Sequence, residues 1–366
     1  MYPRMTRREF LAGAAMGGAT AATLASGMLG RSRAEAAEDI VAVMWGGPFI
    51  EASKPISEAY TKQGKGNVNW ELHAGGSFLI AAKIRATWPV VKYDVTSGGS
   101  LLFSAMDKEG WLDTVTMDEC PNLRDVQAET IMKDAKGNLK TLPLSVTGAF
   151  WGYRTDLVKK PITTLEELLE PRFKGQLCMT DTTNHPGMGL TTFALQRGGN
   201  ERKIEPGFEF AKELARKGTF GRVATTETDF INSLTTGETS VGFWNMGGWS
   251  AVAKNFPVTI LNRLKDNKGL LDVEALGVLK GPRSKAAKEF ANFFISAENN
   301  ESYNRGITEG PVNKKSKASP DLAKFLYKPE EVATYGYYPD FAYISTQLDG
   351  WTKRWEAEIV PLIRKG

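Results

Sequence analysis

The stretch IVAVMWGGPFIEASKPISEAYTK (residues 40–62), with VNWEL (68–72) after it, decides the fold class. Six uninterrupted apolar residues predict a buried strand at 40–45, and the Gly-Gly-Pro that follows ends it. Apolar residues then recur at helical spacing over 49–62, and residues 68–72 alternate as in a half-exposed strand. Strand, helix and strand in this order favour a mainly parallel sheet flanked by helices, an α/β fold.

The same order continues along the chain. Further helices are expected near 78–86, 101–109, 208–215, 284–297 and 351–363, and further strands near 93–96, 148–153, 176–181, 240–245 and 274–279. A length of 366 residues exceeds one typical domain, so two lobes are expected. The composition is 42% hydrophobic and 24% charged, which excludes a disordered chain. The two cysteines, Cys120 and Cys178, exclude a disulfide scaffold and are expected to be free.

The first 36 residues differ in composition from the rest. TRREFL (6–11) precedes a weakly apolar, Ala- and Gly-rich run that ends in AEA (34–36). Paired arginines before such a run resemble a twin-arginine export signal, and small-x-small is a cleavage pattern. We therefore expect residues 1–36 to be a cleavable twin-arginine signal peptide of a periplasmic protein; the alternative is an uncleaved anchor.

Removing this leader changes the charge argument. Residues 1–36 hold five Arg and two Glu, so the mature chain carries a net charge near +1 instead of the +4 of the whole sequence. A nearly neutral body has no electrostatic reason to bind nucleic acid or anionic lipid.

The motifs of common enzymes and nucleotide-binding proteins are absent from the sequence. There is no phosphate-binding G-x-x-x-x-G-K-[ST] loop, no G-x-G-x-x-G after a strand and no G-x-S-x-G elbow. His73 and His185 are the only histidines, and with two distant cysteines they have no zinc-ligand spacing. An enzyme is therefore the weaker class, and neither a metal nor a cofactor is expected.

Small clusters of Gly, Ser, Thr and Trp follow several predicted strands. They contain Trp45, Gly46 and Gly47; Gly76 and Ser77; Gly99 and Ser100; Thr182, Thr183 and His185; and Trp244 and Asn245. In open α/β sheets, ligands lie beyond the carboxyl ends of strands, where glycines admit backbone N–H groups and an indole gives a flat wall. Each cluster alone could be a tight turn or part of the core, but five at equivalent ends favour a binding cleft.

Three segments resemble extracellular solute-binding proteins of ABC transporters. TLEELLEPRFKGQLCMT (164–180) is similar to their S-W-x-D-L-W-x-P-x-[FY]-K-G-K stretch, and GETSVGFWN (237–245) to their G-E-V-x-x-x-x-W-N strand. EGPVN (309–313) resembles their G-x-x-P-x-N turn. With the Trp45 opening, the resemblance covers the mature chain and is closest to the spermidine/putrescine-type binding proteins.

The resemblance implies a fold and partners. The fold would be a two-lobed periplasmic-binding-protein fold of type II, with two mainly parallel sheets joined by two crossover strands at 143–153 and 272–279 and closing like a hinge. Lobe 1 would comprise 37–147 and 273–319, and lobe 2 would comprise 148–272 and 320–366. The partners would be a small-molecule ligand and the permease and ATPase of an ABC transporter, and the protein would be a monomer.

The resemblance also implies ligand residues, one position at a time. Trp45 and Trp244 match two aromatic residues of polyamine binders, and Glu274 matches a carboxylate on the return crossover. Two acids of those proteins are replaced here by Thr182 and His185, and Glu309 or its neighbour stands at an aromatic position. A shorter amine therefore fits better than a long polycation.

Other interpretations stay open. Thr182, Thr183 and His185 at a helix N-terminus could instead hold a small carboxylate or an amino-acid-like anion. The ferric-ion branch of the same superfamily needs adjacent tyrosines near position 244, where this chain reads Phe-Trp-Asn, so iron is not expected. Two competing functions are an exported α/β enzyme that uses the cleft, and a sensor or adaptor subunit that binds the ectodomain of a histidine kinase instead of a permease.

Overall fold

The computed structural model describes residues 37–364, apart from 74–75, 91, 183–184, 186 and 323. The predicted signal peptide at 1–36 and Thr183 of the predicted site lie outside the described residues. Residues Glu38–Gly366 form one compact unit.

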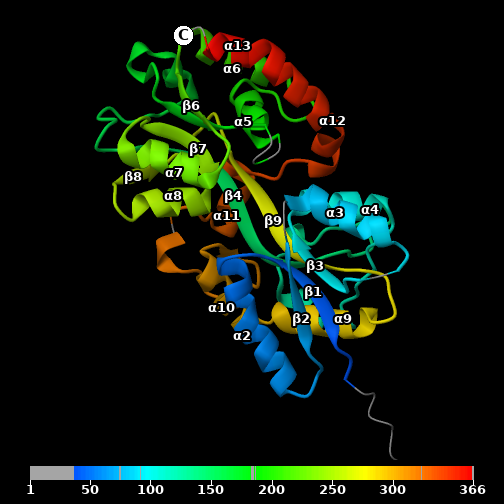
Figure 1. Ribbon diagram of the computed structural model, residues 1–366. Coiled ribbons are helices and arrows are strands. Elements are labelled where there is room, and N and C mark those ends of the chain that lie inside the picture. Colours follow the sequence, from blue (N-terminus) through cyan, green and yellow to red (C-terminus); the bar gives the residue numbers. More distant parts are fainter. Residues whose placement is uncertain are drawn as a thin grey trace, which may run out of the picture. The chain divides into compact units, whose positions relative to one another are not determined.

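One mixed sheet runs through this unit (Figure 1), with its main strands in the order β2-β1-β3-β9-β4-β7-β5-β6. Its strands are β1 (Ile40–Trp45), β2 (Val68–His73), β3 (Val95–Gly98), β4 (Leu142–Arg154), β5 (Leu177–Thr180), β6 (Phe220–Ala224), β7 (Val241–Asn245), β8 (Val258–Ile260), β9 (Gly269–Val278), β10 (Gly310–Pro311) and β11 (Gly336–Tyr337). The pairs of β1 with β2 and β3, and of β5 with β6 and β7, are parallel. The expected α/β class with flanking helices is confirmed. The two mainly parallel sheets that were expected are instead one mixed sheet, because β4 and β9 pair antiparallel with each other and with β7 and β3.

Helices cover both faces of the sheet. They are α2 (Pro48–Lys62), α3 (Gly76–Thr87), α4 (Ser100–Lys108), α5 (Met188–Gln196), α6 (Glu205–Arg216), α7 (Glu227–Thr236), α8 (Met246–Ala253), α9 (Ser284–Phe294), α10 (Ala297–Ile307), α11 (Pro329–Tyr335), α12 (Phe341–Arg354) and α13 (Val360–Ile363). Short 3₁₀ turns occupy Pro121–Asp125, Ala128–Thr130, Leu165–Leu169, Pro171–Phe173 and Pro320–Leu322, and a π turn occupies Trp355–Ile359. Each of α2, α4 and α8 begins within three residues of the end of a strand, as the short β–α connections predict.

The hydrophobic core is divided between the two ends of the sheet. Two clusters gather residues of β1, β3, α2, α9 and α10, and two others gather residues of β5, β7, α5, α6 and α7. We call these two parts lobe 1 and lobe 2; the residue boundaries given above for them remain predictions.

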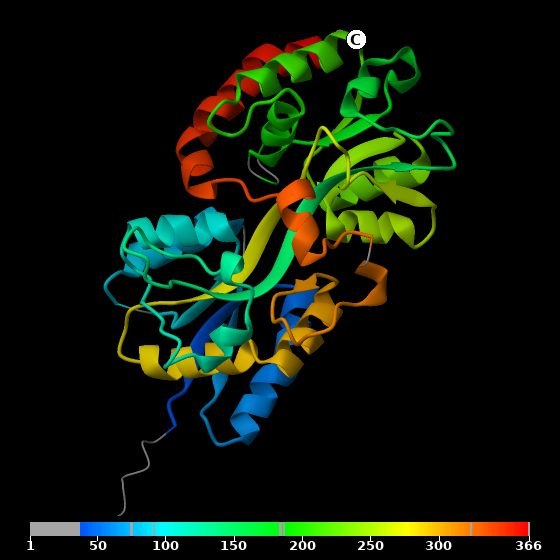
Figure 2. The same cartoon turned by 180° about the vertical axis from the view of Figure 1, so that it is seen from behind.

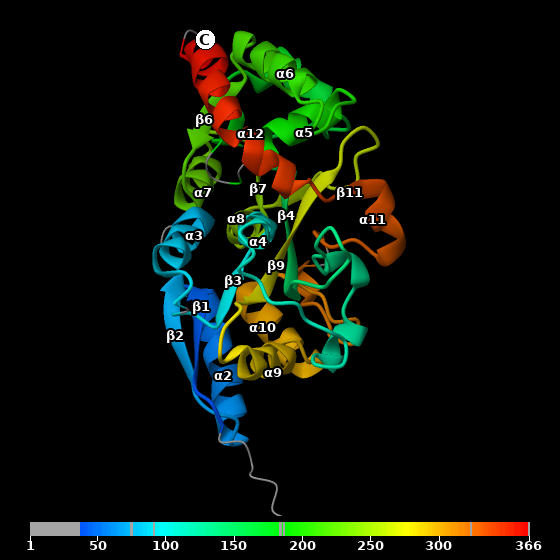
Figure 3. The ribbon, with the colours of Figure 1, turned by 90° about the vertical axis from the view of Figure 1, so that its right-hand side faces the viewer.

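The long strands β4 and β9 connect the two parts (Figures 1 and 3). They pair antiparallel from Leu142–Leu276 to Ala149–Leu270, with β3 of lobe 1 on one flank and β7 of lobe 2 on the other. We call β4 and β9 the hinge strands. Because side chains alternate along a strand, one face of this ribbon presents residues 145, 147, 272 and 274, and the other presents 146, 148, 150, 271 and 273.

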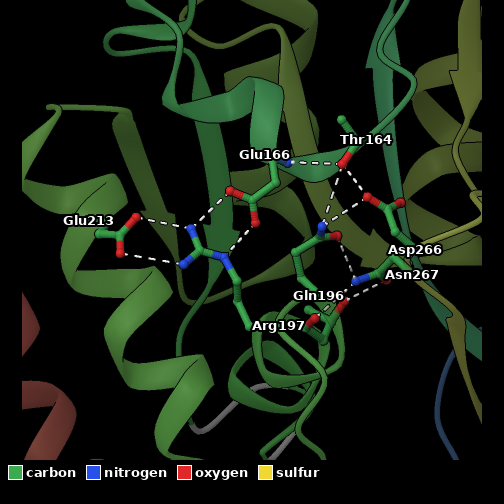
Figure 4. A network of polar contacts seen from close by, with 8 residues as sticks. Thr164, Glu166, Gln196, Arg197, Glu213, Asp266 and Asn267 are labelled. Atoms are coloured by element: carbon green, nitrogen blue, oxygen red, sulfur yellow. Dashed lines mark hydrogen bonds and ion pairs between the residues drawn. The ribbon is translucent and has the colours of Figure 1, made fainter.

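A polar network braces lobe 2 away from the hinge strands (Figure 4). Arg197, directly after α5, binds Glu166 at 2.5 and 2.9 Å and Glu213 of α6 at 3.0 and 3.4 Å. Beside it, the Gln196 amide donates to Asp266 at 3.0 Å. The bidentate geometry fixes α5 and α6 against the segment before β5.

Both cysteines are free and buried, as expected, and burial raises the pKa of each thiol to about 12. Within the described part of the chain, no helix is long and apolar enough to cross a membrane. No group of three or more His, Cys, Asp or Glu side chains that could hold a metal ion is found among the described residues.

Candidate ligand-binding cleft

Two acids lie on one face of the hinge strands. Asp272 and Glu274 are two residues apart on β9, and they face Thr147 and Ser145 of β4 in the register of the pair. Side chains that are directly opposite in an antiparallel pair have Cβ atoms about 5 Å apart. The two carboxylates and two hydroxyls therefore form one polar patch in the middle of the protein.

A third acid, Glu309, reaches this patch from the end of α10. Thr308 ends the helix in the left-handed conformation, with φ of 61°, and the Glu309 N–H donates to the Asn304 carbonyl at 3.2 Å. This tight reversal turns the side chain of Glu309 onto the Ser145 hydroxyl, which donates to it. Glu309 is only 9% exposed. A left-handed non-glycine residue is costly, which fits a segment held in place for a site.

The acids of β9 are held by lobe 1. The indole Nε1 of Trp45 donates to Glu274 Oε2 at 3.3 Å, and the backbone N–H of Ser100 donates to Asp272 Oδ1 at 3.3 Å. A methyl group on Gly99 would lie 2.8 Å from Asp272 Oδ2 and 3.6 Å from Glu274 Oε1. Both carboxylates therefore border the space that the missing side chain of Gly99 leaves open.

No basic side chain among the described residues pairs with Asp272, Glu274 or Glu309. Burial raises the pKa of Asp272, and burial together with the charges of Glu309 and Asp272 raises the pKa of Glu274 well above its usual range. Burial also raises the pKa of Glu309 to about 7, although the Ser145 and Thr147 hydroxyls favour its charged form. Without a cation, burial favours the neutral form of these carboxyls, and a cation in the site would favour their ionised form.

An aromatic pair borders the acids. Trp45 ends β1 and His73 ends β2, in register, and their rings stack with centroids 3.6 Å apart. His73 is 6% exposed, neither ring nitrogen has a hydrogen-bond partner in the described structure, and burial followed by the charge of Lys83 lowers its pKa to about 4. The ring is neutral at neutral pH and supports one face of the indole.

A cavity of about 630 Å³ opens on the acid side, between the start of α2 and the end of α10 on one side and α7 and α8 on the other. Thr147, Asn245 and Glu309 are among the residues that line it. Four exposed charged residues of both signs form part of its rim: Glu227, Lys254, Asp321 and Lys324. Its volume is in the range of small-molecule sites.

A second cavity, of about 600 Å³, lies on the opposite face of the hinge strands. Val146, Phe150 and Leu271 line it, together with residues of the C-terminal segment that contains α11. Figures 2 and 3 show the position of α11 next to the hinge strands. Most of its lining is apolar, and none of the three carboxylates contributes to it, whereas Glu309 lines the first cavity. Asp272, Glu274 and Trp45 are not among the residues that line either cavity, so they reach the first one only through the polar patch that they share with Glu309. The acid face is therefore the candidate ligand site.

Not every residue predicted from the sequence reaches the acids. Trp244 is fully buried, stacked on Phe230 with ring centroids 5.0 Å apart, and it lies in the core of lobe 2. The structure does not bring it to the cavity as a wall. Its neighbour Asn245 does line the cavity, and its side chain accepts from the Gly248 N–H at 2.9 Å to cap α8.

The remaining predicted residues lie at helix entrances. Gly46 and Gly47 connect β1 to α2, Gly76 and Ser77 begin α3, and Thr182 and His185 precede α5. Thr182 is buried, and His185, with φ of 59°, lies edge-on to Trp244 with ring centroids 4.8 Å apart.

Sequence reasoning missed two residues of the site, Asp272 and His73. A signal for Asp272 was present, because it and Glu274 are the only charged residues in the otherwise apolar segment LLDVEALGV. His73 could have been found from its place one residue after the half-exposed strand at 68–72.

Residues 56–360 match the model of the family described as bacterial extracellular solute-binding protein. The chain belongs to this family. No curated protein matches the sequence.

Solved structures share the fold of this solute-binding protein. An ABC transporter protein of Clostridium perfringens has 19% identity and a TM-score of 0.75, and the match covers 87% of this chain and 99% of that one. The spermidine/putrescine ABC transporter substrate-binding protein PotD of Streptococcus pneumoniae has 14% identity and a TM-score of 0.72, with 89% and 98% covered. The periplasmic binding protein AgtB of Agrobacterium tumefaciens, solved with agropinic acid, has 19% identity and a TM-score of 0.60, with 88% and 98% covered. These neighbours support the two-lobed type II fold, and the differences in their ligands mean that the fold alone does not set the ligand.

Proposed function

We propose that this solute-binding protein captures a small organic amine cation between its lobes and delivers it unchanged to the permease and ATPase of an ABC transporter. The observation that carries the proposal is the convergence of Asp272, Glu274 and Glu309 on one face of the hinge strands without a basic partner. An ammonium group would stabilise the ionised form of these buried acids, and the indole of Trp45 would offer it a cation–π surface.

The competing ligand class, a small carboxylate, is disfavoured by the same geometry. Anionic ligands bind at helix N-termini, where backbone N–H groups are free. Here the Ser100 N–H at the start of α4 is taken by Asp272, and the Gly248 N–H at the start of α8 is taken by Asn245. The start of α2 lines the cavity without a side-chain cap, but an anion there would share the cavity with Glu309. An anion would also face three carboxylates.

Ligand binding to purified protein, freed of any bound ligand by unfolding and refolding, tests the proposal. A thermal-shift panel of diamines, monoamines, amino acids and carboxylates should show stabilisation by amines alone, since a ligand at 100 times its Kd adds about 2.7 kcal/mol. Larger shifts with carboxylates would overturn the amine class, and chemical conversion of a bound amine would favour the competing enzyme.

The variant Glu274→Gln should weaken amine binding at least ten-fold in calorimetry, because a desolvated charge pair contributes more than about 1.4 kcal/mol. Glu58→Gln is the matched control, since Glu58 is an exposed acid of α2 that lines neither cavity. Equal affinities of the Glu274 variant and the unchanged protein would remove the main anchor of the proposal.

We also propose that the protein reaches the periplasm through the twin-arginine pathway and loses residues 1–36. The support is the TRREFL and AEA pattern together with the extracellular character of the family. Intact mass of the exported protein should correspond to a chain that starts near Ala37, and replacement of both Arg7 and Arg8 by Lys should block export. Export of the double variant at the normal level would contradict this route.

A further inference from the structure

We infer that Glu309 matches the charge of the site to the charge of its ligand: it is partly protonated when the cleft is empty or holds a monocation, and it loses that proton to the solvent when a dication binds. This inference rests on the proposed amine-binding function and concerns the number of charges that the ligand carries. The three acids do not occupy equivalent positions.

Glu274 is the acid beside the aromatic wall. It accepts a hydrogen bond from Trp45 and borders the open space at Gly99. A first ammonium group that stacks on Trp45 therefore pairs with Glu274. Asp272 is engaged by the α4 N-terminus through Ser100, so its charge is partly compensated by the protein itself.

Glu309 lies across the strand pair from this first position. It binds Ser145, the residue that β4 places opposite Glu274, and it also lines the cavity of about 630 Å³. The hydroxyls of Ser145 and Thr147 can donate to a carboxylate or accept from a carboxylic acid, so both protonation states are accommodated.

The charged and titratable groups around Glu309 come from every neighbouring element. Asp272 of β9 disfavours its ionisation, and Glu309 in turn raises the pKa of Glu274. Tyr303 of α10 is uncharged because burial raises its pKa well above the usual value. On β2, His73 is neutral at pH 7. At the rim of the cavity, Lys254 and Lys324 are balanced by two exposed acids, Glu227 and Asp321.

These neighbours determine whether Glu309 is protonated in the empty cleft and with each ligand bound. Burial raises the pKa of Glu309 to about 7, so the side chain is near half-protonated at neutral pH in the empty cleft. A monocation that ionises Glu274 forms a pair without net charge, so it gives Glu309 no reason to lose the proton that it holds in the empty cleft. A second ammonium group beside Glu309 adds a positive charge that favours the carboxylate and drives that proton into the solvent, and the measured count belongs to the coupled group of acids.

Calorimetry with two probes of equal carbon chain, 1,4-diaminobutane and n-butylamine, tests this at pH 7. Titrations in buffers of different ionisation enthalpy give the number of protons released per ligand. The diamine should release about half a proton or more beyond the monoamine. In Glu309→Gln this difference should vanish, and affinity for the diamine should fall at least ten-fold while affinity for the monoamine changes less than about three-fold.

The control Glu58→Gln, at an exposed acid of α2 that lines neither cavity, should keep the difference in proton count. Equal proton counts for the two probes in the unchanged protein overturn the inference while leaving amine binding intact, and this comparison does not depend on how well the variant folds. A difference that persists in Glu309→Gln overturns the role of this residue. Absence of binding by either amine overturns the proposed function and the inference together.

Discussion

Replacing Glu309 by glutamine should stabilise the ligand-free protein at pH 8 far more than at pH 5. Burial raises the pKa of this carboxyl to about 7, from an ordinary value of 4.5. A carboxyl whose pKa is raised on folding favours the folded state below its unfolded-state value, and this contribution is lost as pH rises through the folded-state value. With about 1.4 kcal/mol for each pKa unit, Glu309 lowers the free energy of unfolding by roughly 2 to 3 kcal/mol between pH 5 and 8.

Urea unfolding of the ligand-free protein at pH 5, 6, 7 and 8 measures this effect. Glutamine keeps the size of the side chain and can still accept from Ser145, so the free energy of unfolding of Glu309→Gln should gain roughly 2 to 3 kcal/mol relative to the unchanged protein across this range. The exposed control Glu227→Gln should run parallel to the unchanged protein. A constant difference between Glu309→Gln and the unchanged protein from pH 5 to 8 would refute the reasoning that Glu309 is buried without a cation.

Two glycine variants should separate binding from stability. In Gly99→Ala the new methyl group would lie 2.8 Å from Asp272 Oδ2, the end of a side chain that can move, so amine affinity should fall several-fold in calorimetry while the free energy of unfolding changes by less than about 1 kcal/mol. In Gly248→Ala the methyl group would lie 2.4 Å from Cδ1 of the buried Trp244 indole, so urea unfolding should show a loss of about 1 to 2 kcal/mol, with amine affinity nearly unchanged. A loss of stability with unchanged affinity in Gly99→Ala would contradict the assignment of Gly99 to the ligand site. A loss of affinity with unchanged stability in Gly248→Ala would contradict the assignment of Gly248 to the core.

Much of the fold could be predicted from hydrophobic patterning. The strand expected at 40–45 is β1, residue for residue, and the strand expected at 240–245 differs from β7 by one residue. The hinge strand β4 begins six residues before the strand that patterning indicates at 148–153. Its first part, LPLSVT (142–147), contains Pro143, Ser145 and Thr147, which interrupt the apolar pattern. Ser145 and Thr147 contact Glu309, so the interruption is the polar face of the site.

The site was less predictable because its parts come from distant segments. Trp45, Glu274 and Glu309 were predicted, and the structure brings them to one end of lobe 1 and the hinge strands. Patterning could not reveal that Asp272 shares their face, because the face of a residue on a strand depends on the register between β4 and β9. That register is set by contacts between residues more than a hundred positions apart.

The two tryptophan-glycine clusters show why composition alone does not identify a ligand loop. Near Trp45, the missing side chain of Gly99 leaves space that two carboxylates border. Near Trp244, the absence of a side chain on Gly248 leaves room for the buried indole of Trp244 itself. Both patterns look alike in a sequence, because a glycine leaves space whether a ligand or a core side chain occupies it. The neighbours that fill the space decide the difference: unpaired carboxylates attract a cation, whereas a packed indole stabilises the fold. An accumulation of buried, unpaired charge is therefore the better indicator of the ligand site in this protein.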